Sequence, residues 1–228
     1  MFIPSCVNCQ FKKNFFAKMS PEELEIVNTN RKEIKYQKGD LICKQGTTPT
    51  HIICMYNGLA KIYIEGNSSI LLQILTSQNY IGIQNIIVPE NTDDTYHYSV
   101  SALEDTHACL LDINQFRKVA YNNLSVSIEI LHYLAKMEAE FLKKIETLSQ
   151  KNSHGRIADA LLYLTEIFNT DKIDLRLTRK DIADFSSTSL ENTIRILSEL
   201  KSDNIINLDG KRLEILDKKK LTQIRNLG

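Results

Sequence analysis

The last third of the sequence holds a group of polar side chains whose donors and acceptors suit the edges of DNA bases. These residues are Ser189, Glu191, Asn192 and Arg195. A guanidinium can donate two hydrogen bonds to O6 and N7 of guanine, and a carboxylate can accept one from N4 of cytosine. Glu191 and Arg195 are therefore the candidates for base contacts, and Asn192 has the length to reach a base or a phosphate.

The same two charged residues also have a simpler explanation. Glu191 and Arg195 are four positions apart, and on any helix such a pair forms a surface ion pair worth a few tenths of a kcal/mol. The elements on either side of the pair decide between the two interpretations.

Two short helices separated by a turn are predicted to carry these residues. Thr178, three positions before Asp181, forms a capping pattern that predicts a helix over 178–185. After a short polar break, Ser189 is suited to cap a second helix over 189–202. The side chains expected to be buried are Ile182, Ala183 and Phe185 in the first helix and Ile194, Leu197 and Leu200 in the second.

A hairpin is predicted directly after the second helix. Residues 204–216 form two alternating runs around Asp209-Gly210, and Asp-Gly between alternating apolar residues is a strong hairpin pattern. A hairpin in this place is a wing, so the pattern predicts a winged helix-turn-helix and favours base contacts over a mere ion pair.

Apolar residues recur at helical spacing in the middle of the chain. They are Leu131, Leu134, Phe141, Ile145 and Leu148, with Glu138 as a polar interruption at the same spacing. So narrow a stripe is typical of a surface that faces a partner helix, which predicts a homodimer. Packing of this helix on its own subunit is the alternative.

Short apolar or alternating runs between residue 33 and about residue 116 predict β-strands. Glycines stand between the runs at Gly39, Gly46, Gly58 and Gly66. Strands and turns this closely spaced predict a β-barrel or roll.

The composition sets broader limits. A chain of 228 residues, 43% hydrophobic and 25% charged with no net charge, is typical of a soluble protein with two domains. It has no signal peptide and no apolar run of about 20 residues, so we expect a cytoplasmic protein without membrane contact. Five cysteines, an odd number, favour reduced thiols or metal ligands over disulfides. No catalytic constellation is evident, so an enzyme is not expected.

Several segments resemble one family of regulators. The segment LTRKDIADFSSTSLENTIRILSELKSDNII resembles the DNA-binding domain of the CRP/FNR superfamily, named after the cAMP receptor protein and the fumarate-nitrate regulator. The segments YQKGDLICKQG, IICMYNGLAKIYIEG and SALEDTHACLLDINQF are similar to its cyclic-nucleotide-binding roll. The likeness implies a transcription regulator that binds palindromic double-stranded DNA as a homodimer and meets RNA polymerase.

The resemblance also implies an α+β fold in three parts. We expect an N-terminal double-stranded β-helix or jelly roll of the cyclic-nucleotide-binding type at 1–120, a dimerisation helix at 121–150 and a C-terminal winged helix-turn-helix at 151–228. The alternative is a regulatory or scaffold module that retains the roll but does not bind DNA.

Individual residues receive roles from the resemblance. Base-reading positions are occupied by Glu191 and Arg195, phosphate-contacting positions by Arg179 and Lys180, and a wing position by Lys211. Leu190 stands where some relatives carry an arginine, so a different half-site is expected.

The ligand groups of the cyclic-nucleotide-binding relatives are replaced. Those relatives hold the ribose with a glutamate and the phosphate with an arginine-serine pair. Here Ile83 follows Gly82, and Tyr96-His97 takes the place of Arg-Ser. Without the carboxylate and the guanidinium, cAMP is not expected, and the effector of this region is taken to be a redox signal, nitric oxide or an unknown small molecule.

The sequence raises two candidate metal cofactors. Cys6, Cys9 and Cys109 resemble three of the four ligands of an iron–sulfur cluster in the fumarate-nitrate branch, but the fourth cysteine is missing from its expected place. For Cys43, Cys54 and Cys109 a buried apolar setting is favoured, because each lies within an apolar strand pattern. A haem would need a histidine, and the candidates are His51, His97, His107 and His132. The sequence assigns neither cofactor.

Overall fold

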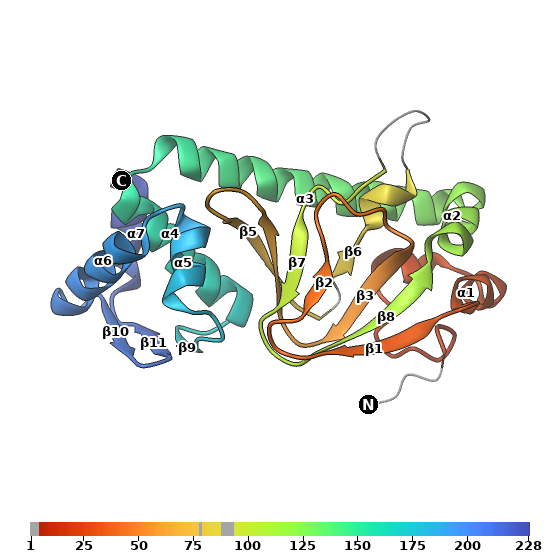
Figure 1. The fold of residues 1–228 in the computed structure, drawn as a ribbon, viewed down its shortest axis with the longest axis horizontal. Coiled ribbons are helices and arrows are strands. Elements are labelled where there is room, and N and C mark those ends of the chain that lie inside the picture. Colours follow the sequence, from red (N-terminus) through yellow and green to blue (C-terminus); the bar gives the residue numbers. More distant parts are fainter. Residues whose placement is uncertain (1–4, 78, 88–93) are drawn as a thin grey trace. The chain divides into compact units, whose positions relative to one another are not determined.

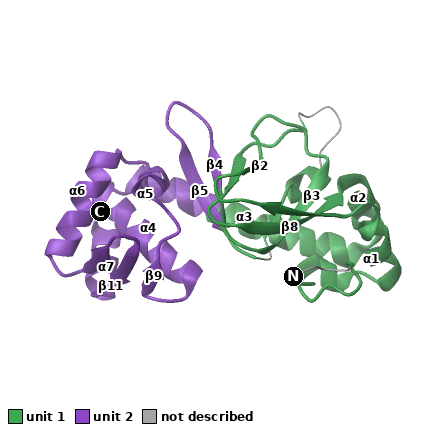
Figure 2. Cartoon of the chain, turned by 60° about the horizontal axis from the view of Figure 1, so that its bottom comes forward, with its two compact units in different colours: residues 1–61, 75–140 green, residues 62–74, 141–228 purple. Residues whose placement is uncertain are grey.

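The structure is a computed structural model, and it describes residues 5–77, 79–87 and 94–228 (Figure 1). The chain forms two compact units, residues 1–61 with 75–140 and residues 62–74 with 141–228 (Figure 2). An N-terminal β-roll, a long helix and a C-terminal winged helix-turn-helix follow one another, which confirms the predicted fold class. The three functional segments at 1–120, 121–150 and 151–228 stay a prediction.

The roll begins with short helices and continues with strands. Its helices are η1 (Asn14–Lys18), α1 (Pro21–Asn28), η2 (Ile83–Ile86) and α2 (Ile113–Asn122). Its strands are β1 (Lys32–Tyr36), β2 (Leu41–Cys43), β3 (His51–Asn57), β4 (Ala60–Ile64), β5 (Ile70–Leu75), β6 (Tyr80–Ile81), β7 (Ser99–Ala102) and β8 (Thr106–Asp112). One sheet has the strand order β1-β8-β3-β6, and the other has the order β2-β7-β4-β5.

The first sheet is characterised by one strand pairing and one tight turn. Strand β8 pairs antiparallel with both β1 and β3, and its Cys109 stands opposite Cys54 of β3. The turn from β3 to β4 requires a glycine, because Gly58 has φ +97° and an added Cβ would lie 2.5 Å from Oγ1 of Thr106.

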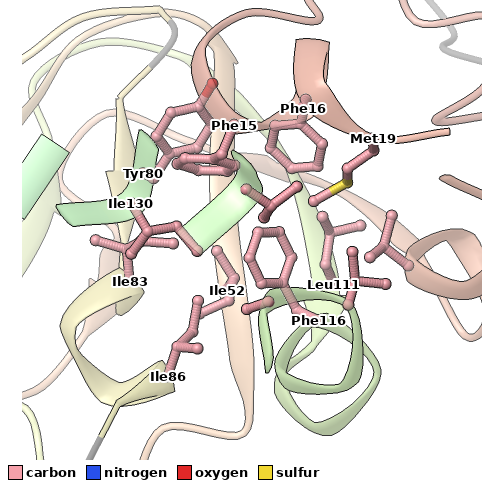
Figure 3. Close-up of a cluster of buried hydrophobic side chains, with 14 of the residues drawn as sticks. Phe15, Phe16, Met19, Ile52, Tyr80, Ile83, Ile86, Leu111, Phe116 and Ile130 are labelled. Atoms are coloured by element: carbon pink, nitrogen blue, oxygen red, sulfur yellow. The ribbon is translucent and has the colours of Figure 1, made fainter. Parts of the chain in front are cut away.

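An aromatic and aliphatic cluster fills the space between the first sheet and the helices of the same unit (Figure 3). Phe15 and Phe116 are completely buried and meet edge to face, with ring centroids 5.4 Å apart. Ile83 of η2 belongs to this cluster and is also completely buried. Burial of this apolar surface holds the N-terminal helices against the roll.

Helix α3 (Leu124–Gln150) presents two different faces. In its first half, Val126 and Ile130 are buried in the cluster and Leu134 packs against it. A second row, at alternating spacings of four and three residues, is exposed; it consists of Leu124, Ile128, Leu131, Ala135, Glu138, Leu142 and Ile145.

The predicted stripe on this helix is therefore divided. Leu131, Glu138 and Ile145 are exposed, whereas Leu134, Phe141 and Leu148 are half-buried. The predicted stripe and the exposed row share positions 131, 138 and 145. They differ in the residues between these positions, and the spacing in the sequence did not show which of those residues are exposed.

The second unit contains the remaining elements. They are α4 (Ser153–Phe168), β9 (Lys172–Asp174), α5 (Arg179–Ser186), α6 (Leu190–Ser202), β10 (Ile206–Asp209), β11 (Arg212–Ile215) and α7 (Lys218–Leu227). The hairpin β10–β11 is the predicted wing, and β9 adds a third strand beside β11. No helix in the described part of the chain is long and apolar enough to cross a membrane.

Candidate DNA-binding surface and sensor regions

Helix α5 starts where the capping pattern predicts. The Thr178 side chain accepts a hydrogen bond from the Asp181 amide, and the Asp181 carboxylate accepts one from the Thr178 amide at 2.7 Å. The helix ends at Ser187, which adopts the left-handed conformation at φ +47°. The sharp turn that follows sets the direction of α6.

Helix α6 begins with the predicted cap. The Ser189 hydroxyl accepts a hydrogen bond from the Asn192 amide at 3.2 Å. The hydroxyls of Thr188 and Thr193 form a hydrogen bond with each other at 2.6 Å. Ser189 and Glu191 are exposed at the start of this helix and Asn192 is partly exposed. The first turn of α6 thus presents polar groups to solvent.

The buried face of α6 differs from the prediction at one residue. Leu197 and Leu200 are buried as expected, but Ile194 is 48% exposed. Thr193 and Ile196 are completely buried, because the row 193, 196, 197, 200 follows the helical repeat more closely than a row through 194. Ile194 consequently lies on the outer surface, next to Arg195 in the chain.

Arg195 is held by two neighbours on its own helix. Its guanidinium donates to Oδ1 of Asn192 at 2.7 Å and forms an ion pair with Glu199. Within the described residues its ion pair is therefore with Glu199, four positions later, and not with Glu191. Glu199 also meets Nε2 of His154 at 2.9 Å, and the hydrogen bond from His154, followed by the charge of Arg195, lowers the pKa of Glu199.

The cations expected to meet phosphates lie at the start of α5 and at the tip of the wing. Arg179 donates from Nη2 to the carbonyl of Gly210 at 2.7 Å, which ties the helix-turn-helix to the wing. Lys211 follows Gly210 and is exposed. Lys180 is exposed and forms an ion pair with Asp184, one helical turn away. The structure therefore brings Arg179 to the wing tip, which the sequence did not indicate.

A buried lysine lies beneath the helix-turn-helix. Lys144 of α3 is 8% exposed, donates to the carbonyl of Phe185 in α5 and lies 3.4 Å from the centroid of that ring. Burial lowers the pKa of Lys144 to about 7, although Asp159 acts in the opposite direction. Phe185 stacks on Tyr163 of α4 at 4.8 Å, and the Tyr163 hydroxyl accepts from the Ile74 amide in β5.

The region predicted to hold an effector is packed with the protein's own side chains. Ile83 and Tyr96 are buried, whereas His97 is exposed. A Cβ added to Gly82 would lie 3.3 Å from the Tyr96 hydroxyl. The Tyr98 hydroxyl accepts from Nε2 of Gln84 at 2.7 Å and from the Gly82 amide at 3.4 Å. A network of tyrosine, glutamine and backbone groups thus fills the region that the resemblance predicted for an effector.

Four of the five cysteines line one small cavity. They are Cys6, Cys9, Cys54 and Cys109. Arg31 lines the same cavity, donating from Nη1 to Sγ of Cys109 at 3.0 Å and pairing with Glu33 at 3.0 Å. Burial raises the pKa of Cys6 to about 12 and also raises that of Cys54 and Cys109. Cys43 lies in strand β2, outside this set.

The cysteines around this cavity have the donor atoms that some metal sites need. Four thiols around one cavity are the ligand set that an iron–sulfur cluster or a structural zinc ion requires. In the described chain as it stands, no three cysteine, histidine or acidic side chains are grouped closely enough to share one ion. The sequence did not indicate Cys54 as a neighbour of the other three, because only the register of β3 against β8 places it opposite Cys109.

The histidines considered for a haem are dispersed. The ring of His51 meets Oγ1 of Thr50, and the ring of His107 lies 5.9 Å from that of Tyr56. His97 and His132 are exposed. Neither these two contacts nor the exposure of the other two side chains distinguishes one histidine as a haem ligand.

Comparison with known proteins gives the class of each half. A model of the cyclic nucleotide-binding domain matches residues 33–123, and a model of the Crp-like helix-turn-helix domain matches residues 155–224. The chain is 22% identical over 205 residues to the anaerobic regulatory protein of Bacillus subtilis, with 87% of this chain and 84% of that protein covered. It is 24% identical over 219 residues to the transcriptional activator protein FnrL of Cereibacter sphaeroides, with 91% and 86% covered.

Solved structures show the same fold. A putative transcriptional regulator of the CRP/FNR family from Eubacterium rectale superposes with a TM-score of 0.76 at 18% identity, covering 94% of this chain and all (100%) of that one. FixK2 from Bradyrhizobium japonicum gives 0.74 at 18% identity, covering 85% and 96%. The fold and the two domain models define a protein with a cyclic-nucleotide-binding-like roll followed by a Crp-like winged helix-turn-helix. The chain belongs to the CRP/FNR superfamily and is a DNA-binding transcription regulator of that type.

Proposed function

We propose that the protein binds a palindromic operator as a homodimer and places α6 of each subunit in the major groove. The observation that carries the proposal is the exposed first half of α6, which presents Ser189, Glu191 and Arg195, together with the hydrogen bond by which Arg179 of α5 joins the wing. In a helix-turn-helix protein the first residues of the second helix reach the base edges. Arg179, Lys180 and Lys211 then contact phosphates, while Glu191, Asn192 and Arg195 contact bases.

The dimer forms through the exposed row of α3. Leucines and isoleucines at alternating spacings of four and three residues are the pattern by which two helices pack side by side. Of the residues expected at the dimer interface, Leu131 and Ile145 belong to this exposed row. Leu142, whose side chain is 58% exposed, belongs to it as well. A two-fold dimer spaces its recognition helices by about 34 Å, so that they enter successive major grooves.

The roll responds to a signal other than a cyclic nucleotide. A cyclic phosphate needs cationic or donor groups around it, and the corresponding positions here hold buried Ile83 and Tyr96. Redox change, nitric oxide or another small molecule therefore remain the effector classes. DNA binding by the dimer is expected to bring the protein to RNA polymerase.

The decisive experiment compares Arg195→Ala with Lys219→Ala. Genomic fragments bound by the purified protein are selected, and affinity for the recovered palindrome is measured by fluorescence anisotropy. Losing a bidentate contact to guanine costs about 1–3 kcal/mol per half-site, so Arg195→Ala should weaken binding by at least tenfold. Lys219→Ala removes an exposed cation of α7 and should leave the affinity unchanged. A scaffold that does not read DNA would recover no common sequence, and both variants would behave alike.

A further inference from the structure

The arginine assigned to a base contact shares a carboxylate with a histidine. Glu199 of α6 pairs with Arg195 through Oε1, and its Oε2 lies 2.9 Å from Nε2 of His154 in α4. Arg195 also donates to Oδ1 of Asn192 at 2.7 Å. These four side chains belong to the second unit, so one continuous network joins the beginning of α4 to the outer face of α6.

The position of His154 is fixed by the beginning of α4. Asn152 caps this helix, and its Oδ1 accepts hydrogen bonds from the amides of His154 at 3.0 Å and of Gly155 at 3.1 Å. The first turn of α4 thereby holds the imidazole beside Glu199. Both side chains are 44% exposed, so the protonation of this pair follows the pH of the solution.

The other charged groups around His154 leave Glu199 as its partner. On the surrounding elements the charged side chains are Asp203 at the end of α6, Lys220 of α7, and Arg156 and Asp159 of α4. Asp203 and Lys220 line the groove beside His154, and their opposite charges offset each other. Those of α4 have other partners, because Arg156 donates to the carbonyl of Ser186 and Asp159 pairs with Lys151.

Protonation of His154 weakens the attraction between Glu199 and Arg195. Histidine is the side chain that ordinarily changes charge between about pH 5 and pH 8. Glu199 stays ionised there, because the hydrogen bond from His154, and then the charge of Arg195, lower the pKa of its carboxyl. A charged imidazole offsets part of the carboxylate charge and repels the guanidinium, so Arg195 leaves Glu199 at a smaller cost in free energy.

The same coupling acts in the opposite direction when DNA binds. Once Arg195 has moved to a guanine, Glu199 faces His154 without a competing cation, and the imidazole binds a proton more tightly than in the free protein. Binding to the matched operator therefore takes up protons, and its affinity rises as the pH falls. A duplex without that guanine leaves Arg195 on Glu199 and gains nothing from the proton.

We propose that His154 is a positioning residue for DNA reading: when protonated, it releases Arg195 from Glu199 and sharpens discrimination at the base pair that Arg195 contacts. The inference rests on the proposed contact between Arg195 and a base. Because exposed ion pairs contribute little, the gain in affinity is about twofold per subunit and about fourfold for a dimer.

The test compares affinities near pH 6 and near pH 8 at one ionic strength. Fluorescence anisotropy follows binding of the full-length protein to the recovered palindrome, and to a duplex in which the base pair read by Arg195 is replaced in both half-sites. That base pair is the one whose preference disappears when the selection is repeated with Arg195→Ala. We expect about fourfold tighter binding to the palindrome at the lower pH, and less than about twofold change on the replaced duplex.

Variants decide whether His154 causes the pH dependence. His154→Gln keeps a hydrogen-bonding group without charge, so its affinity should stay at the lower value at both pH values. His154→Lys carries a permanent charge and should bind with the higher affinity at both. Glu199→Gln removes the shared carboxylate and should abolish the pH dependence. The control His107→Gln, in the first unit, should keep the whole change. Circular dichroism verifies each fold.

Four results would overturn the proposal. They are equal affinity for the palindrome at the two pH values, an equal rise on the replaced duplex, and an undiminished rise in folded His154→Gln or in folded Glu199→Gln. A rise that survives either substitution would come from phosphates or other groups and not from this network. Failure of the proposed function looks different, because Arg195→Ala would then bind the palindrome as tightly as the unaltered protein.

Discussion

Replacing Lys144 with methionine should stabilise the protein near neutral pH and make its stability less dependent on pH. The amine is buried under Phe185, and its pKa falls from 10.5 to about 7 on folding. Below about pH 7 it is protonated in both the folded and the unfolded state. Between pH 7 and 10.5 the unfolded chain holds more of this proton than the folded one, so the stability that depends on Lys144 rises with pH.

The magnitude follows from the two pKa values. The charged amine destabilises the fold by roughly 4 kcal/mol at pH 7 and by roughly 2 kcal/mol at pH 9. Methionine keeps the length of the side chain and its contact with the aromatic ring, but it loses the hydrogen bond to the Phe185 carbonyl, worth about 1 kcal/mol. Lys144→Met should therefore be more stable by roughly 3 kcal/mol at pH 7 and by roughly 1 kcal/mol at pH 9.

Urea unfolding followed by circular dichroism at the two pH values measures this difference. Thiols and tyrosines that are buried in the folded protein begin to ionise in this range only in the unfolded chain, and because they do so in both proteins they cancel in the comparison. Lys143→Met alters the exposed neighbour on the same helix and should shift neither value. An equal stability difference at pH 7 and pH 9 would refute the assignment of a neutralised buried amine.

Three further outcomes test the proposed regulator. Leu131→Glu places a charge in the exposed row of α3 and should convert the dimer to a monomer in analytical ultracentrifugation. The control Lys136→Glu, on the same helix, should remain a dimer. A dimeric Leu131→Glu protein would exclude this row as the dimer interface. Lys211→Ala should weaken binding to all DNA sequences alike. It should also reduce the slope of log K against log salt concentration by about two for a dimer, because each subunit loses one phosphate contact. An unchanged slope would show that Lys211 does not contact DNA. Calorimetric titration with cAMP should give no binding heat, because Ile83 and Tyr96 are buried where the ligand groups would stand, and a measurable affinity would contradict that account.

The helix-turn-helix and its wing were predictable because their determinants are local. Thr178 and Asp181 cap one helix, Ser189 caps the next, and Asp209-Gly210 sits in the hairpin, and each pattern spans only a few residues. The error at Ile194 arose within the same segment. A shift of one position turns a side chain by about 100° around a helix, and the apolar pattern did not distinguish 193 from 194.

Other parts of the surface and the roll depend on distant contacts. An ion pair between Arg195 and Glu191 was the alternative to base contacts, and the structure instead joins Arg195 to Asn192 and Glu199. Cys54 and Cys109 are separated by a long stretch of chain and meet only through the register of β3 against β8. Helix α7 was not predicted, since its lysine-rich start carries only a weak apolar repeat.

The partners of Arg195 bear on how strictly the operator is read. A free guanidinium that met the wrong base would be desolvated without a partner, and the full penalty of that loss would exclude the sequence. Here Glu199 and Asn192 remain within reach, so an arginine facing a mismatch returns to acceptors on its own helix. In the proposed complex, the base pair opposite Arg195 is consequently the position at which related, imperfect operators are tolerated, and one protein surface can occupy many promoters to graded extents.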